Sequence, residues 1–156
     1  MIVSGTGHRK IFDRYYPHRS WNKVCEETTR ILEELKPTLI WSGGAMGFDS
    51  LIIDAAMAIG IAYSMAIPFK GQESRWNLES QERYQSYIKG AESVVIVSDG
   101  GYSVDKMQAR NEYLVNNCDT LIALFNPRQG GGTMNCLNYA KKVGKPIIQI
   151  NPLELR

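Results

Sequence analysis

The sequence of 156 residues contains few of the side chains that build metal sites or disulfide frameworks. It has 3 cysteines (Cys25, Cys118 and Cys136) and 2 histidines (His8 and His18). Three cysteines cannot all pair within one chain, and their spacing does not match that of a zinc motif. We therefore expect reduced thiols in a cytoplasmic protein without a bound metal.

Long apolar runs and a large net charge are also missing. No stretch approaches the ~18 apolar residues that suggest a membrane span, and the N-terminus lacks the basic-then-apolar pattern of a signal peptide. The net charge of +2 is too small to favour nucleic acid as a partner. The arginines are nevertheless unevenly placed, since Arg9, Arg14 and Arg19 share the first loop, whereas Arg110 and Arg128 precede a run of glycines.

Apolar runs alternate with segments of helical periodicity along the whole chain. They predict strands at 1–6, 38–41, 61–67, 93–98, 121–125 and 145–150, and helices at 21–35, 48–59, 78–89, 105–117 and 133–143. Because the strands are apolar throughout, a mainly parallel sheet with helices on both faces is expected. The sequence thus predicts an α/β, Rossmann-like, doubly wound fold, and its length predicts a single domain over 1–156.

Two glycine-rich turns, each between a strand and a helix, are the main functional signal. The first is Ser42-Gly43-Gly44-Ala45-Met46-Gly47-Phe48-Asp49, and the second is Gly130-Gly131-Gly132-Thr133. Glycines at a helix start let an anion approach backbone N–H groups, where the helix dipole adds partial positive charge. Neither turn matches the dinucleotide fingerprint or the P-loop, so we expect a phosphorylated ligand but no NAD or other cofactor.

Other candidates also fall at the ends of predicted strands, where doubly wound sheets bind ligands. His8 and Arg9 follow the first strand, and Arg110 lies in a helix. Tyr102 and Trp76 lie in loops, where their rings are candidates for stacking on a base. Each has a structural alternative: Asp49 caps a helix, His8 bonds to backbone, and Arg110 lies on a solvated face. The predicted ligand-binding set is His8, Arg9, Ser42, Gly43, Gly44, Asp49, Tyr102, Arg110, Gly130, Gly131, Gly132 and Thr133.

These motifs together resemble the SLOG superfamily, which joins the DprA/Smf and LOG proteins. The matching residues are Thr6-Gly7-His8-Arg9, the first glycine turn, Met107 to Val115, and Gly131-Gly132-Thr133. The order and spacing are most similar to the YpsA-like branch of bacteria and some phages. The resemblance implies a nucleotide or nucleotide-derived ligand at the glycine turns, cyclic or ADP-ribose-like forms included, and a homodimer or larger homo-oligomer.

The sequence departs from the LOG pattern at one residue. LOG enzymes cleave the N-glycosidic bond of nucleoside monophosphates with an arginine, matched here by Arg110, and a glutamate, whose place is taken by Cys136. Glycoside hydrolysis needs a carboxylate, so we expect ligand binding and name no catalytic residue. The resemblance implies a sensor or sequestering protein of phage or mobile-element origin. The alternative is a phosphoribohydrolase with a relocated carboxylate, and a DNA-handling protein is a third reading.

Overall fold

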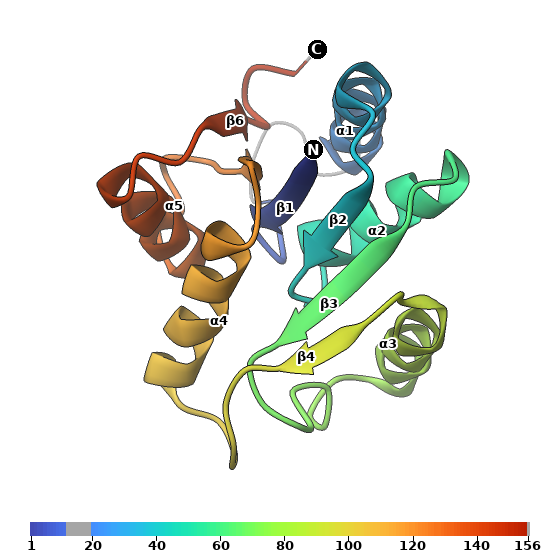
Figure 1. Ribbon diagram of the computed structural model, residues 1–156, viewed down its shortest axis with the longest axis vertical. Helices are drawn as coiled ribbons and strands as arrows, with labels where there is room; N and C mark the ends of the chain where they lie inside the picture. The colour runs from blue at the N-terminus through green and yellow to red at the C-terminus, as the bar shows by residue number, and fades with distance from the viewer. Residues whose placement is uncertain (12–19, 156) are drawn as a thin grey trace.

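The computed structural model describes residues 1–11 and 20–155, in which strands and helices alternate (Figure 1). The strands of this part of the chain are β1 (Ile2–Gly7), β2 (Leu39–Ser42), β3 (Tyr63–Ile67), β4 (Val94–Ile96), β5 (Thr120–Leu124) and β6 (Ile147–Ile150). The helices are α1 (Ser20–Leu35), α2 (Phe48–Ala58), α3 (Leu78–Gly90), α4 (Val104–Asn116) and α5 (Gly132–Lys142). Every predicted element is present.

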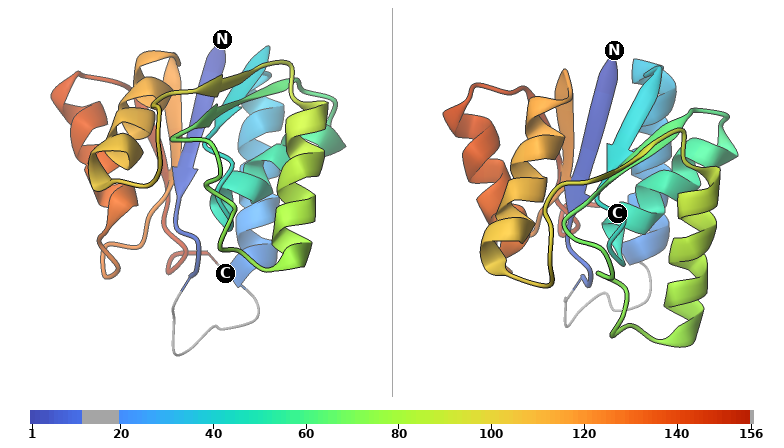
Figure 2. Two further views of the ribbon diagram at one scale, coloured as in Figure 1. Left: turned by 90° about the horizontal axis from the view of Figure 1, so that it is seen from below. Right: turned by 60° about the horizontal axis from the view of Figure 1, so that its bottom comes forward.

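The six strands form one parallel sheet in the order β4-β3-β2-β1-β5-β6. Successive strands are added on one side of β1 up to β4, and on its other side from β5 onward. Helices α1, α2 and α3 cover one face of the sheet, and α4 and α5 cover the other (Figure 2). The chain therefore has the predicted doubly wound fold, and its switch point lies between the carboxyl ends of β1 and β5.

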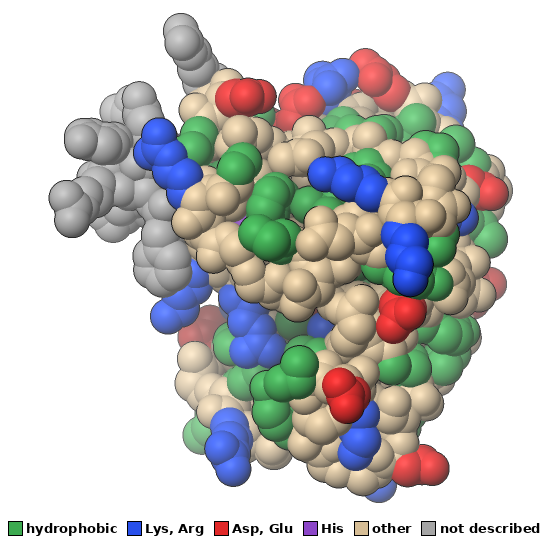
Figure 3. Space-filling model, turned by 90° about the vertical axis from the view of Figure 1, so that its left-hand side faces the viewer, with side chains coloured by type: hydrophobic (Ala, Val, Ile, Leu, Met, Phe, Trp, Pro, Cys, Tyr) green, Lys and Arg blue, Asp and Glu red, His purple; other side chains and the backbone are tan. Residues whose placement is uncertain are grey.

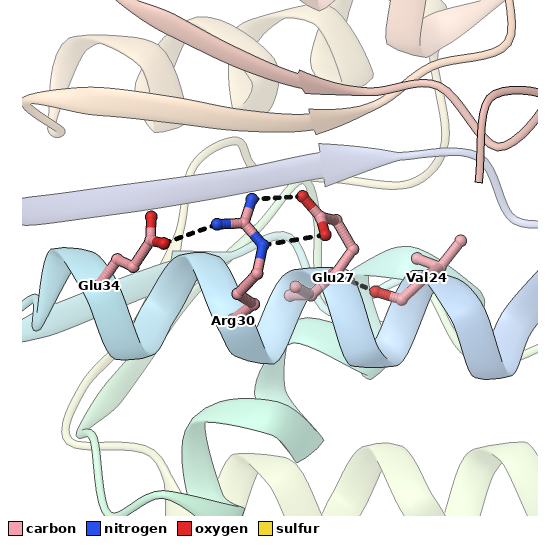
Figure 4. A network of polar contacts seen from close by, with 5 residues as sticks. Val24, Glu27, Arg30 and Glu34 are labelled. Carbon is pink, nitrogen blue, oxygen red and sulfur yellow. Dashed lines mark hydrogen bonds and ion pairs between the residues drawn. The ribbon is translucent and has the colours of Figure 1, made fainter. Parts of the chain in front are cut away.

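Helix α1 shows how the sequence separates a core face from a solvent face. Val24 and Leu32 are fully buried in the main hydrophobic cluster, two turns apart on the same side of the helix. On the outer side, Arg30 forms ion pairs with Glu27 at 2.6 Å and with Glu34 at 2.7 Å (Figure 4). These pairs join residues three and four positions apart, which is the spacing that supports a helix at its surface.

Some elements are shorter than the sequence predicts because backbone groups close the preceding helix. β3 begins at Tyr63 rather than at residue 61, since the Ile61 N–H donates to the Ala56 carbonyl at the end of α2. β6 begins at Ile147 because the Lys145 N–H donates to the Ala140 carbonyl of α5. Within the described residues, no helix combines the length and the apolar character that crossing a membrane requires.

The interior contains several aromatic and cysteine side chains. Tyr63, Tyr84 and Tyr87 are each 3% exposed and belong to the main hydrophobic cluster. Cys118 and Cys136 are buried in a second cluster between α4, α5 and the sheet. These side chains therefore serve packing, and the polar residues at the carboxyl ends of the strands are left to form a site.

Candidate functional site

The first glycine turn is held together by its own side chains. The Ser42 hydroxyl accepts a hydrogen bond from the Gly44 N–H at 3.2 Å and donates to the Asp49 carbonyl at 2.8 Å. The Asp49 carboxylate accepts from the Ala45 N–H at 3.1 Å. Asp49 thus braces the turn instead of capping α2, whose N-cap, Gly47, makes no side-chain cap bond. Two backbone donors of this turn are consequently already used.

Gly43 is the point where the turn meets α4. Its carbonyl accepts hydrogen bonds from Arg110 Nη1 at 2.9 Å and from Gln72 Nε2 at 3.0 Å. A Cβ on Gly43 would lie 2.5 Å from Arg110 Nη1 and 2.9 Å from Asp49 Oδ2. A side chain at this position would therefore push apart the two charged groups that form the floor of the site.

Asp49 and Arg110 are a buried pair of opposite charges, 6% and 5% exposed. Burial raises the pKa of the Asp49 carboxyl, and this rise is opposed by the guanidinium of Arg110, by the Ala45 N–H and by the guanidinium of Arg9. Burial likewise lowers the pKa of Arg110, and Asp49 opposes that change. Each group thus offsets part of the other's desolvation cost.

The second glycine turn is open where the first is closed. Gly131 is the N-cap of α5 with a φ of 89°, and it makes no side-chain cap bond. A Cβ placed on Gly131 or Gly132 would meet no atom of the described chain within 4 Å. There is therefore open space beside the first turn of α5, at the positive end of the helix dipole, as an anion site requires.

His8 joins the two strands at the switch point. Its Nε2 accepts a hydrogen bond from the Asn126 N–H, just beyond β5, at 2.9 Å. The ring is 7% exposed, and burial lowers its pKa. Because Nε2 must be unprotonated to accept this bond, His8 is neutral in the folded protein. His8 is therefore a brace between strands, as the structural alternative for this residue anticipated.

These groups surround a cleft of about 490 Å³ at the carboxyl edge of the sheet, between α4 and α5. Figure 3 views the molecule from the side on which α4 and α5 lie and shows a hollow bordered by Lys or Arg and by hydrophobic side chains. The cleft brings together seven of the predicted residues: His8, Arg9, Asp49, Tyr102, Arg110, Gly132 and Thr133. The others do not line it: Ser42, Gly43 and Gly44 lie in its supporting turn, and Gly130 and Gly131 precede α5.

Helix α4 contributes lining residues that the predicted set omitted. Met107, Gln108 and Asn111 face the cleft together with Arg110. Asn111 also donates through Nδ2 to the Gly132 carbonyl at 3.4 Å, which links α4 to the second glycine turn. The helical spacing from Met107 through Arg110 was visible in the sequence. Which of its neighbours faced the cleft depended on how α4 packs against α5.

Arg9 and the loop aromatics form the outer part of the site. The guanidinium carbon of Arg9 lies 5.7 Å from the centre of the Trp76 ring, as in a cation–π contact. Tyr102 is 70% exposed and packs edge-on against Phe69, with ring centres 6.1 Å apart. The ring of Tyr102 is therefore open to a ligand, whereas the ring of Trp76 already has the guanidinium of Arg9 over it. Arg14, Arg19 and His18 lie outside the described residues.

Cys136, which stands where the LOG glutamate would be, is fully buried. Burial raises the pKa of its thiol to about 11, so the thiol is protonated at neutral pH. Asp49 is the only carboxylate among the described residues that line the cleft. In the same part of the chain, no three His, Cys, Asp or Glu side chains gather as a metal site would need.

Comparisons with known proteins identify the relatives of this chain. A family model described as the YspA SLOG family matches residues 18–155. The uncharacterized SPbeta prophage-derived protein YoqJ of Bacillus subtilis (strain 168) is 29% identical, over 83% of this chain and 88% of YoqJ.

Two solved structures share the fold at low sequence identity. DNA processing protein A from Helicobacter pylori, solved to explain its single-stranded DNA binding mode, superposes with a TM-score of 0.70 and 20% identity, covering 99% of this chain and 67% of that one. The molybdenum cofactor binding protein from the phototrophic bacterium Rippkaea orientalis superposes with a TM-score of 0.61 and 15% sequence identity. The match covers 97% of this chain and 78% of that one. The same architecture therefore carries sites for different ligands.

Proposed function

This chain belongs to the YspA SLOG family, and on that premise we propose that it binds a nucleotide or nucleotide-derived ligand in the cleft between α4 and α5. The observation that carries the proposal is the open N-terminus of α5. There, Gly131 and Gly132 leave room beside the first N–H groups of the helix, which have no partner within the helix itself, and the Thr133 hydroxyl stands next to them. A phosphate fits such a place because the N–H groups and the helix dipole favour negative charge.

The rest of the cleft supplies groups for the other parts of a nucleotide. Arg9, at the mouth, adds positive charge beside the phosphate, and Arg110 adds it from the floor. In this proposal Asp49, which lines the cleft, accepts a hydrogen bond from a ribose hydroxyl, and the exposed ring of Tyr102 stacks on a base. The first glycine turn, with Ser42 and its two neighbouring glycines, supports this floor.

We further propose a role in sensing or sequestering the ligand. The absence of a carboxylate at Cys136 supports binding without cleavage, and the prophage origin of YoqJ supports a phage or mobile-element setting. We also propose that residues 1–156 form one domain, that the protein acts in the cytoplasm and that it needs no cofactor. A nucleoside monophosphate hydrolase is the alternative, because Asp49 and Arg110 lie together in the cleft.

Single-stranded DNA is a third candidate partner, because the H. pylori neighbour binds it. The small net charge of +2 argues against it for this chain. An affinity that fell steeply with salt and rose with the length of an oligonucleotide would support DNA over a small nucleotide.

The variant Gly132→Val tests the phosphate site directly. A side chain at Gly132 meets no protein atom within 4 Å, and the residue has no positive φ, so the fold should tolerate valine. Thermal shift over mononucleotides, cyclic nucleotides and ADP-ribose selects a ligand, which stabilises the protein by about 2.7 kcal/mol at 100 times its Kd. Titration calorimetry should then show binding to the natural protein and none to folded Gly132→Val.

The matched control is Asn138→Val, an exposed position farther along the same helix. It introduces the same side chain into α5 but lies away from the glycine turn, so ligand affinity should be unchanged. Unaltered affinity in folded Gly132→Val would remove the α5 N-terminus as the phosphate site.

A further inference from the structure

A second cavity of about 880 Å³ opens next to the cleft. It lies between the loop at 68–77, which follows β3, and the loop that carries Tyr102. Arg9, Tyr102 and Met107 line both the cavity and the cleft, so the two spaces meet at these three side chains. Each space alone has the volume that proteins use for a drug-sized ligand, roughly 300–1,000 Å³.

The lining of the second cavity is cationic and aromatic. It includes Arg9, Lys70 and Arg75, and no carboxylate from the described part of the chain. The rings of Phe69, Trp76 and Tyr102 line it as well. A lining that holds cations but no carboxylate favours an anionic ligand, and aromatic side chains offer faces on which bases of any sequence stack. The combination suits a nucleotide unit better than a free phosphate.

The cavity wall is fixed by contacts to the floor of the cleft. Gln72, 8% exposed, donates from Nε2 to the Gly43 carbonyl at 3.0 Å and to the Tyr84 hydroxyl at 3.3 Å. Its Oε1 has no hydrogen-bond partner among the described residues, so the wall keeps an unused acceptor. The loop is thereby tied to the carbonyl that also holds Arg110, and the two spaces are kept in one arrangement.

We infer that the ligand is a dinucleotide, two nucleosides joined through phosphate, with one half in the cleft and the other in the second cavity. This inference rests on the proposed function. The phosphate of the first half lies on the N-terminus of α5, and Arg9 stands at the junction, where the linking phosphate passes. Lys70 and Arg75 attract the second half, and its base stacks on the ring of Trp76 or Tyr102.

The test compares 5′-AMP with two dinucleotides, NAD⁺, joined by a pyrophosphate, and cyclic di-AMP, joined by phosphodiesters. Titration calorimetry should show at least one of them binding tenfold or more tightly than 5′-AMP. In the double variant Lys70→Ala/Arg75→Ala this advantage should disappear, while the affinity for 5′-AMP stays within twofold. The two positions are exposed, so the variant should fold.

Two controls separate charge from specific placement. Lys141→Ala/Lys142→Ala removes the same charge from the last turn of α5 and should leave the dinucleotide advantage intact. Lys70→Arg/Arg75→Lys keeps both charges in the second cavity and should retain most of the advantage.

The outcomes distinguish this inference from the proposed function. Equal affinities for 5′-AMP and both dinucleotides would overturn the dinucleotide assignment and leave nucleotide binding in place. An advantage that survives Lys70→Ala/Arg75→Ala would likewise overturn it. An affinity that keeps rising from cyclic di-AMP to a ten-nucleotide single strand would replace it with nucleic acid. Failure of every probe to bind would instead contradict the proposed function.

Discussion

His8 links the ends of two strands through a single hydrogen bond, and this bond depends on its protonation state. Burial lowers the pKa of His8 in the folded protein below the value of 6.5 that the unfolded chain has. Between these two pKa values the unfolded chain binds more protons than the folded one. The free energy of unfolding should therefore fall as the pH drops through about 6.5 toward the pKa of the folded state.

The variant His8→Gln isolates this effect, because its side-chain oxygen can accept the Asn126 N–H as Nε2 does but does not titrate. Urea unfolding of both proteins from about pH 7.5 to 5.5 should show the natural protein losing stability relative to His8→Gln as the pH falls. A difference between the two that stays constant over this range would show that His8 is not held neutral.

The position of the Arg110 side chain could be predicted from the sequence, but its neighbour could not. Its position in a helix before β5 predicted a side chain near the strand ends, and its guanidinium is there, bonded to the Gly43 carbonyl. The sequence did not reveal that Asp49 would lie beside it under the same turn, because residues 43 and 110 meet only through the packing of α4 on the sheet. A phosphate contact of Arg110 remains part of the proposal.

Among the described strands, β4 is the one that leaves large apolar side chains exposed. It is an outer strand of the sheet, paired with β3 alone, and Val94 and Ile96 are 36% and 50% exposed. The apolar faces of α1 and α2 offer less surface to a second copy, because they are largely buried in the core of the chain itself. An exposed edge strand is a ready surface for a second copy.

We therefore expect a homodimer or larger homo-oligomer that uses β4. Light scattering at micromolar concentration should give at least twice the mass of one chain. Ile96→Lys should reduce that mass to the monomer, because a charge on an edge strand opposes pairing. The matched control Met57→Lys, at a side chain 49% exposed near the end of α2, should leave it unchanged. A monomeric mass for the natural protein would show the expectation to be wrong.

Local sequence patterns predicted the type and order of every element because those signals act within a few residues. Apolar runs marked the strands, and glycines with positive φ, such as Gly60 and Gly144, closed helices at the expected places. The ends were less predictable where a helix continues its hydrogen bonding past its last residue, as at Ile61 after α2. Such ends depend on donors and acceptors that composition does not reveal.

At the scale of the whole molecule, the site exists because the strand order brings distant segments together. β1 and β5 are neighbours although more than a hundred residues separate them in the sequence. Helices α4 and α5 flank the cleft at the carboxyl ends of these two strands. The alternation of strands and helices predicted a doubly wound, mainly parallel sheet, but it did not predict the order of the strands. The second cavity was not predicted, because its cations and aromatic rings come from loops with no regular pattern.

The most direct test of nucleotide binding without cleavage is the identity of what the protein retains and releases. The purified natural protein is incubated with the mononucleotides, cyclic nucleotides and dinucleotides named above and separated from free ligand by gel filtration. It is then denatured, and the released material is analysed by chromatography. We predict an intact nucleotide in near-stoichiometric amount, no accumulation of free base during incubation, and no nucleotide retained by Gly132→Val. Steady release of free base, or the absence of any retained nucleotide, would contradict the account.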